Sequence, residues 1–201
     1  VSDPKKTYTQ RGTGMRLFDS HAHIDDISFK NDFPETLQRA REAGVKAIMV
    51  AGIDLATSQK AMEMVEKHPH IFTSVGVHPH DAKHCSEDVM AELTSLATHE
   101  KVKAWGETGL DFNRMHSPMD VQEKWFIRQI EAADALELPM IFHERDSGGD
   151  CLKFSRTWTI RNAGGWSTVS AGPGRKCLSI LTWDITSASP ALSPFNSAGR
   201  F

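Results

Sequence analysis

The chain of 201 residues contains only three cysteines, a single tyrosine and no long apolar run. Cys85, Cys151 and Cys177 are scattered without CxxC spacing, which indicates a reducing compartment and no disulfide framework. No stretch is apolar over the ~20 residues needed to cross a membrane, and residues 1–14 are too polar for a signal peptide. We therefore expect a cytoplasmic protein with no membrane partner.

An excess of positive charge is also lacking. Lys and Arg together number 23 against 26 Asp and Glu, which gives a formal net charge of −3. This balance argues against a broad electrostatic grip on nucleic acid. It does not exclude an enzyme whose bound metal ions meet a phosphate group.

Histidine is absent from the last quarter of the chain. All ten histidines precede residue 149, and the only acidic residues after it are Asp150 and Asp184. The segment 150–201 is instead rich in Ser, Thr, Gly, Pro and Trp, without a helical or strand period. We therefore expect a disordered leader over residues 1–14, a structured region over 15–149, and a tail over 150–201 that is non-native or disordered.

Apolar runs alternate with amphipathic segments through the structured region. The runs predict five strands, beginning near residues 16, 45, 71, 102 and 138. Helices are predicted over 33–43, 54–67, 86–98 and 118–136. Continuous apolar strands joined by helices are typical of a parallel sheet covered on both faces. Polar groups follow the strands, and no Gly-rich phosphate loop follows the first one. We therefore expect an α/β fold of the TIM-type (β/α)8 barrel class rather than a doubly wound sheet.

His21 and His23 flank one residue at the end of the first predicted strand. In extended backbone, side chains two residues apart point the same way, so both imidazoles can meet one cation. Taken alone, this spacing is weak evidence, because such pairs are common. Asp19 and Asp25 stand nearby and are candidates for orienting the two rings.

Two further strand ends carry candidate metal ligands. Glu107 lies in GETGLD, and a carboxylate can bridge two divalent ions because it has two oxygens; a surface acid is the alternative. His143 closes the fifth strand in IFHERD, and a core histidine bonded to the backbone is the alternative there. His143 is favoured as a ligand because it follows two other strand ends that carry histidine.

Other polar residues near these strand ends are candidates for substrate contact or proton transfer. His78 and His80 in GVHPH, and Arg145 beside His143, are predicted to contact substrate. Asp111 is predicted to act as a base or to orient a ligand. His116, which precedes the last helix, is a weaker candidate for approaching the pocket.

Five segments occur in the order found in a known family: FDSHAHID, VGVHPH, GETGLDF, SPMDVQEKWFIRQI and LPMIFHERD. Together they resemble the TatD family of metal-dependent hydrolases, the deoxyribonuclease-like branch of the amidohydrolase barrels, over Met15 to Gly149. One departure is Met119, where the family often has arginine.

The resemblance implies a monomeric (β/α)8 barrel that hydrolyses phosphodiester bonds of DNA. It implies two divalent ions, Mg, Mn or Zn, per site. His21 and His23 would hold one ion, Glu107 would bridge both, and His143 would hold the second. A water activated by the two ions would attack the phosphate, with Glu107 and Asp111 as catalytic residues.

The resemblance stops after HERDSGG. The family continues with a helix and a strand ending in His-Cys-Phe-Ser-Gly, whose histidine is a further metal ligand, and later has a metal-linked aspartate in Thr-Asp-Ser-Pro. Neither motif is present. Read one base out of frame, GDCLKFSR can encode Arg-Leu-Leu-Glu-Ile-Leu-Lys, and GWSTVSAGP can encode Val-Val-His-Cys-Phe-Ser-Gly-Thr. We therefore predict a frameshift near Gly149 or Asp150 that makes residues 150–201 an out-of-frame tail.

The leading hypothesis is thus a truncated, impaired metal-dependent deoxyribonuclease. A closed barrel needs about eight strands and roughly 250 residues, so we expect the chain as written to fold poorly and to have little activity. A second hypothesis is an amidohydrolase-type deacylase or amide hydrolase, because the same metal cradle can polarise a carbonyl. A third is a non-catalytic metal-binding or interaction module.

Overall fold

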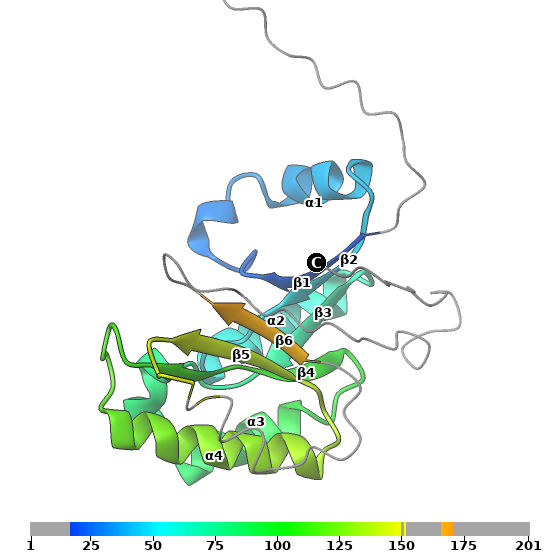
Figure 1. Ribbon diagram of the computed structural model, residues 1–201. Coiled ribbons are helices and arrows are strands. Elements are labelled where there is room, and N and C mark those ends of the chain that lie inside the picture. Colours follow the sequence, from blue (N-terminus) through cyan, green and yellow to red (C-terminus); the bar gives the residue numbers. More distant parts are fainter. Residues whose placement is uncertain (1–16, 150, 152–165, 171–201) are drawn as a thin grey trace, which may run out of the picture.

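A computed structural model describes residues 17–149, residue 151 and residues 166–170 (Figure 1). The predicted leader over 1–14 lies outside the described residues. So does the predicted tail, apart from Cys151 and the segment 166–170. The described part of the chain alternates strands and helices, as the apolar runs predict.

Four α-helices and six strands make up this part, with two short 3-10 helices. The strands are β1 (Leu17–Ala22), β2 (Val45–Val50), β3 (Ile71–Val75), β4 (Val102–Asp111), β5 (Met140–Arg145) and β6 (Trp166–Ser170). The helices are α1 (Phe33–Glu42), α2 (Leu55–Lys67), α3 (Glu87–Leu96) and α4 (Met119–Ala135), with η1 (Ile27–Phe29) and η2 (Pro79–His84). The five predicted strands and four predicted helices are all present, and β6 and the two 3-10 helices are additional.

The starts of α2 and α3 follow directly from their cap residues. The Asp54 carboxylate accepts the backbone N–H of Thr57 at 2.7 Å, and the Thr57 hydroxyl oxygen accepts the N–H of Asp54 at 3.0 Å. This reciprocal capping box satisfies donors that the first helical turn would otherwise leave free. The Ser86 hydroxyl accepts the N–H of Val89 at 3.2 Å and does the same for α3.

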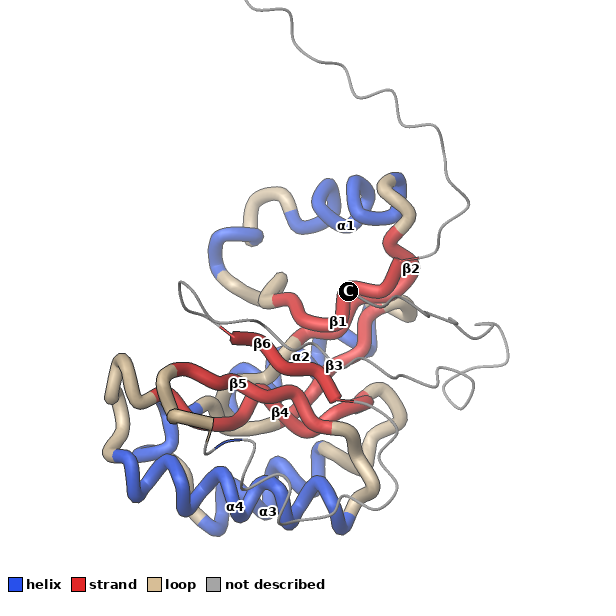
Figure 2. The backbone as a smooth tube through the Cα atoms, viewed as in Figure 1, coloured by secondary structure: helices blue, strands red, loops and turns tan. Residues whose placement is uncertain are grey.

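The strands form one parallel sheet in the order β1-β2-β3-β4-β5-β6. Each strand pairs with the next along the chain. Figures 1 and 2 show the sheet curling, with α1 outside β1 and β2, and with α3 and α4 outside β4 and β5. This is the expected α/β architecture, with helices on the convex face of a curved parallel sheet.

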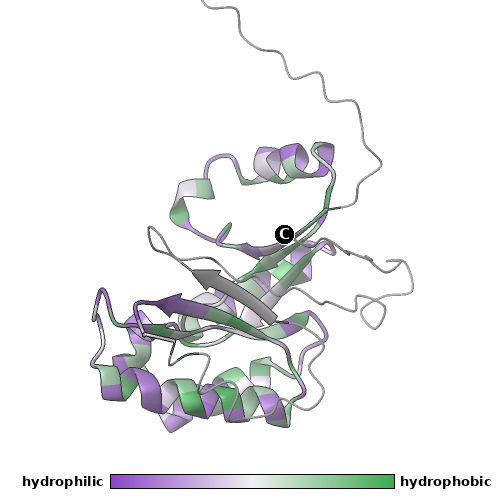
Figure 3. Ribbon diagram, in the orientation of Figure 1, coloured by the Kyte–Doolittle hydropathy of each residue, from purple (hydrophilic) through white to green (hydrophobic). Residues whose placement is uncertain are grey.

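Three apolar clusters hold the layers together. The largest joins β3, β4 and β5 to α3 and α4 around Trp105 and Phe126, and a second packs α1 and α2 on β2. The third, formed by Met49, Ala104 and Ile141, lies between β2, β4 and β5. Figure 3 shows β5 changing from hydrophobic to hydrophilic toward its C-terminal end. Since Ile141 and His143 are two residues apart on β5, they share one face of the strand. The third cluster therefore lies on the same face of the sheet as His143, on the N-terminal side of the polar strand ends.

β6 pairs with β5 in parallel along its whole length, from Met140↔Trp166 to Glu144↔Ser170. Within the described residues, β1 and β6 are the two edges of the sheet. None of the helices described is both long and apolar enough to cross a bilayer.

Candidate metal centre

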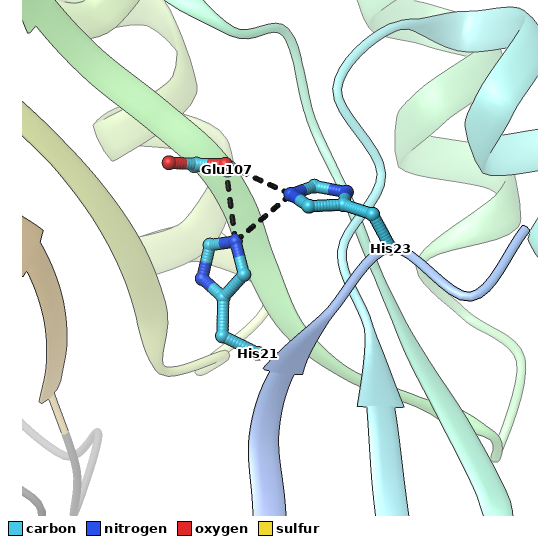
Figure 4. Close-up of side chains that lie close together, drawn as sticks. All are labelled: His21, His23 and Glu107. Carbon is cyan, nitrogen blue, oxygen red and sulfur yellow. Dashed lines mark hydrogen bonds and ion pairs between the residues drawn. The ribbon is translucent and has the colours of Figure 1, made fainter. Parts of the chain in front are cut away.

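Glu107, on β4, is the centre of a polar cluster (Figure 4). Its Oε2 atom lies 3.2 Å from Nε2 of His21 and 3.6 Å from Nε2 of His23. The two Nε2 atoms are 3.1 Å apart, so both imidazoles do point the same way. Glu107 is only 5% exposed, whereas the side chain of His23 is 44% exposed. The cluster therefore has a buried carboxylate at its base and an open side at His23.

The second carboxylate oxygen of Glu107 faces a different pair of histidines. Its Oε1 atom lies 3.1 Å from Nδ1 of His143 and 3.9 Å from Nε2 of His78. These two histidine nitrogens are 3.0 Å apart, and both residues are buried. One carboxylate thus contacts two separate histidine pairs, one through each oxygen.

Asp111 ends β4 and is completely buried. Its Oδ2 atom lies 2.7 Å from Nε2 of His80 and 3.1 Å from Nε2 of His143. Its Oδ1 atom accepts the backbone N–H groups of Asn113 at 3.1 Å and Arg114 at 2.8 Å. Burial by itself raises the pKa of Asp111, but these hydrogen bonds outweigh it and lower the pKa to about 2. The carboxylate is therefore ionised at neutral pH and ties two histidines to the loop after β4.

The ring nitrogens of the two buried histidines face different partners. Nε2 of His143 lies 3.1 Å from Oδ2 of Asp111, and its Nδ1 lies 3.1 Å from Oε1 of Glu107, so this imidazole lies between two carboxylates. The Nδ1 atom of His78 accepts the backbone N–H of His80 at 3.2 Å, so a neutral His78 carries its proton on Nε2. Burial, helped by the charge of His143, lowers the pKa of His78 to about 3. His78 therefore offers a proton beside the carboxylate oxygen of Glu107 that His143 also contacts.

The remaining pKa shifts follow from the same contacts. Burial by itself raises the pKa of Glu107, but the hydrogen bonds from His143, His21 and His23 outweigh it and hold the pKa well below its usual range. The hydrogen bond to Glu107 raises the pKa of His23, against the opposing effect of burial. The cluster therefore contains a buried anion whose charge the surrounding imidazoles stabilise.

Irregular backbone aims these side chains. The β1–β2 pairing shifts register between Asp19 and Ala22, and the β4–β5 pairing shifts between Trp105 and Thr108. Register shifts of this kind re-aim side chains and recur beside active sites. His21 and Glu107 lie inside these two intervals, so each leaves its strand at an irregular position.

Gly109 lets β4 approach β5 beside His143, its partner in the sheet. Its φ of 147° is in the region that favours glycine. A Cβ atom at this position would lie 2.0 Å from the carbonyl oxygen of His143. This close backbone contact fixes the position of His143.

The ligand atoms fit a divalent cation. Three groups of them lie within 4.8 Å of one another: His21, His23 and Glu107; His78, Glu107 and His143; and His80, Asp111 and His143. Atoms bound about 2.1 Å from one ion lie roughly 3.0–3.4 Å apart in tetrahedral or octahedral geometry. The distances of 3.1 Å between His21 and His23 and 3.2 Å between His21 and Glu107 match such ligand pairs. Imidazole and carboxylate donors suit several divalent metals.

The other residues expected at the site are also at this end of the sheet. Arg145 is the last residue of β5, two residues beyond His143, and its side chain is half-buried. In the register of the sheet it lies opposite Asp111 of β4. The exposed ring of His116 stacks on His80, with ring centroids 4.5 Å apart. His116 thus does approach the cluster.

Asp19 is placed differently from the prediction that it orients an imidazole. Its carboxylate accepts the backbone N–H of His21 at 3.2 Å rather than a ring N–H. The Nδ1 atom of His21 is buried and has no hydrogen-bond partner within the described part of the chain. Asp19 therefore orients the backbone of His21, and its contact with the ring is not observed.

Two buried glutamines on α4 support the site and were not predicted. Gln129 Oε1 accepts the N–H of Val77 at 2.7 Å, and its Nε2 donates to the carbonyl oxygen of Val77 at 3.0 Å. Gln122 Oε1 accepts the N–H of Asp111 at 2.9 Å, and its Nε2 donates to the carbonyl oxygen of Ser117 at 2.7 Å. Their sequence signal is a spacing of seven residues, which puts two amides on the apolar stripe that also holds Phe126.

Comparison with known proteins identifies similar chains. A family model described as TatD related DNase matches residues 18–169, a range that continues past Gly149 into β6. The metal-dependent hydrolase YabD of Bacillus subtilis is 37% identical over 167 residues, covering 82% of this chain and 66% of the relative. A 3'-5' ssDNA/RNA exonuclease TatD of Rahnella is 35% identical over 150 residues, covering 74% of this chain and 57% of the relative. The chain thus spans between 57% and 66% of the length of these two relatives.

Solved structures show the same likeness. YJJV, a TatD homolog from Escherichia coli K12, has a TM-score of 0.71 at 25% identity and covers 80% of this chain and 62% of that one. A TatD family hydrolase from Entamoeba histolytica has a TM-score of 0.66 at 26% identity, covering 71% and 54% of the two chains. The expected fold class is confirmed by these similarities.

Proposed function

Because the chain belongs to the family of TatD-related DNases, we propose that it hydrolyses phosphodiester bonds of DNA or RNA single strands with divalent ions held at Glu107. The observation that carries this proposal is the shared carboxylate. Glu107 contacts the His21–His23 pair through one oxygen and the His78–His143 pair through the other. A carboxylate whose two oxygens face different imidazoles suits a pair of ions better than a single one.

In this proposal two ions share the site. His21, His23 and Glu107 would hold the first, and Glu107 and His143 would hold the second. When bound, the ions would act as Lewis acids that neutralise charge on the phosphate and lower the pKa of water. Asp111, whose Oδ2 atom lies 3.1 Å from Nε2 of His143, would orient that imidazole toward Glu107.

His78, His80 and Arg145 serve the substrate. His78 is neutral and carries a proton on Nε2, which suits it to donate to a phosphate oxygen rather than to ligate an ion. Arg145 adds a permanent positive charge that matches phosphate geometry. Asp111 is ionised and accepts four hydrogen bonds, so its role is to position His80 and His143.

The test is hydrolysis of a 3'-labelled single-stranded DNA by the purified chain with Mg2+, Mn2+ or Zn2+. We expect cleavage that stops with EDTA and that falls at least about 100-fold in Glu107→Gln, because the neutral amide cannot serve as an anionic bridge. His70→Ala is the matched control, since His70 is exposed at the opposite end of β3. The control should cleave as the parent chain does.

Parallel assays with ester and amide substrates separate the alternative hydrolase. If the chain hydrolyses an ester or amide substrate but leaves DNA intact, the nuclease proposal is wrong. Metal binding without turnover of any substrate would favour the non-catalytic module.

A further inference from the structure

The loop between β4 and α4, residues 112–118, presents an unusual surface beside the metal centre. Residues 113–116 of this loop are all exposed, and they are followed by the buried Ser117. Among the exposed large hydrophobic side chains of the described residues, two lie here: Met115 at 42% and Met119, the first residue of α4, at 45% exposure. The loop and the first residue of α4 thus place two apolar side chains at the surface.

The loop is firmly held despite its exposure. The Ser117 hydroxyl donates to the carbonyl oxygen of His80 at 2.8 Å and accepts the N–H of Lys83 at 3.0 Å. The Asn113 amide donates to the Asp146 carboxylate, beyond β5, at 2.8 Å. The loop is thus tied to η2 on one side and to the loop after β5 on the other.

The exposed ring of His116 lies within this loop and leads directly to the metal centre. It stacks on His80, with ring centroids 4.5 Å apart and an interplanar angle of 29°. His80 in turn bonds Asp111 at 2.7 Å, and Asp111 contacts His143 at 3.1 Å. The outermost member of this series is therefore a flat ring on the solvent side of the site.

Met115 adds a second indication. Its φ is 50°, a conformation that costs a non-glycine residue energy. The thioether of Met115 is also exposed. Thioether groups and flat rings both pack well on aromatic faces.

We propose that His116, which Met115 and Met119 flank in the sequence, is a stacking subsite for a nucleobase of the strand whose phosphate enters the metal centre. Base–aromatic stacking holds a single strand with little dependence on sequence, because every base has a π-face. The proposal rests on the proposed function and adds the group that distinguishes a polynucleotide from a simple phosphodiester.

The test compares two fluorescein-labelled single-stranded DNA octamers in a Ca2+ buffer by fluorescence anisotropy. One octamer carries thymine throughout, and the other carries abasic tetrahydrofuran residues at its two 3'-terminal positions. The parent chain should bind the thymine octamer about 5- to 50-fold more tightly. His116→Ala should lose this difference by weakening the thymine octamer alone, whereas His116→Phe, which keeps a flat ring, should retain most of it. His70→Ala should bind both octamers as the parent does.

Equal binding of the two octamers by the parent chain would overturn the proposal, as would an equal loss for both in His116→Ala. Hydrolysis with Mn2+ is measured separately on the thymine octamer. A base preference in binding without any hydrolysis would count against the proposed function and would support the stacking subsite.

Discussion

At the scale of single residues, the site depends on how closely two backbones approach. Gly109 and Gly148 both have positive φ, 147° and 67°. A Cβ atom at Gly109 would meet the carbonyl oxygen of His143 at 2.0 Å, whereas one at Gly148 would meet nothing within 4 Å. The two positions therefore separate the effect of φ from the effect of crowding.

We predict that Gly109→Ala costs several times more stability than Gly148→Ala. The conformational penalty of Gly148→Ala is about 1 kcal/mol. Gly109→Ala adds about 1–3 kcal/mol because β4 and β5 must separate. Urea denaturation of both variants measures the difference. Similar losses in the two variants would show that the close approach at His143 is not maintained in solution.

Cys85 provides a prediction for pH. Burial raises the pKa of its thiol from 9.0 to about 11. The thiolate is thus disfavoured in the folded state, so the associated stability is complete below pH 9 and is lost as pH rises through about 11. At pH 8, iodoacetamide should modify Cys85 about tenfold or more slowly in the folded chain than in concentrated urea. Peptide mapping by mass spectrometry identifies the modified cysteine, and equal rates would contradict a raised pKa of the half-buried Cys85 thiol.

At the scale of elements, α4 holds the backbone of the site in position through its buried Gln129. Gln129 satisfies both backbone groups of Val77, the residue before His78, and also accepts the indole N–H of Trp105 at 3.1 Å. These three hydrogen bonds join α4 to β4 and to the end of β3. The position of His78 is therefore set by a side chain from a helix far away in the sequence.

We predict that Gln129→Leu lowers the free energy of unfolding by about 2–4 kcal/mol, because it leaves buried donors and an acceptor without partners. Gln59→Leu on the exposed face of α2 is the matched control and should change stability by less than about 0.5 kcal/mol. Thermal and urea unfolding measure both. A Gln129→Leu chain as stable as its control would show that Val77 finds other partners.

Much of the element order was predictable from local signals. Asp54 and the helical period that follows it predict α2 with its observed N-cap and its observed end at Lys67. Both signals depend only on residues that are close in the sequence. The 3-10 helix after Pro79 was not predicted, since a proline-stiffened loop and a short helical turn share the same sequence features. β6 was not predicted either, because residues 166–170 show no strand period and are placed by pairing with β5.

The sequence predicts which residues meet at the site, but it does not predict which of their atoms are in contact. Parallel strands bring their C-terminal ends to one edge, so the meeting of His21, Glu107 and His143 follows from their positions after strands. The division of Glu107 between two histidine pairs depends on register shifts in β1 and β4. Such irregularities arise from tertiary packing and have no local sequence signature.

At the scale of the whole molecule, the described strands form an open curve whose edges are β1 and β6. An open parallel edge leaves backbone donors and acceptors available for pairing with another chain. β6 lies within GWSTVSAGP, the segment whose shifted reading can encode the further histidine of the family. The frameshift thus stays a prediction with a definite location.

We predict that the coding DNA contains a single-base shift near codon 149 and that correcting it increases nuclease activity at least about 100-fold, by supplying the missing ligands. The measurement compares the chain as written with the corrected chain under identical metal and substrate conditions. Coding DNA in which no single-base shift restores His-Cys-Phe-Ser-Gly would show the prediction to be wrong. So would full metal-dependent nuclease activity in the chain as written.

The contact between His21 and Glu107 has a mechanical consequence. It joins β1 to β4, and these strands are separated in the sheet by β2 and β3. The contact therefore spans the curved sheet from β1 to β4. The distance between the two side chains depends on how strongly these four strands curve. A flatter sheet would increase the distance between His21 and Glu107. A ligand that draws these two side chains together would increase the curvature of the sheet. Spectroscopic labels on the convex side of β1 and β4 would thus record events at the metal centre without touching it.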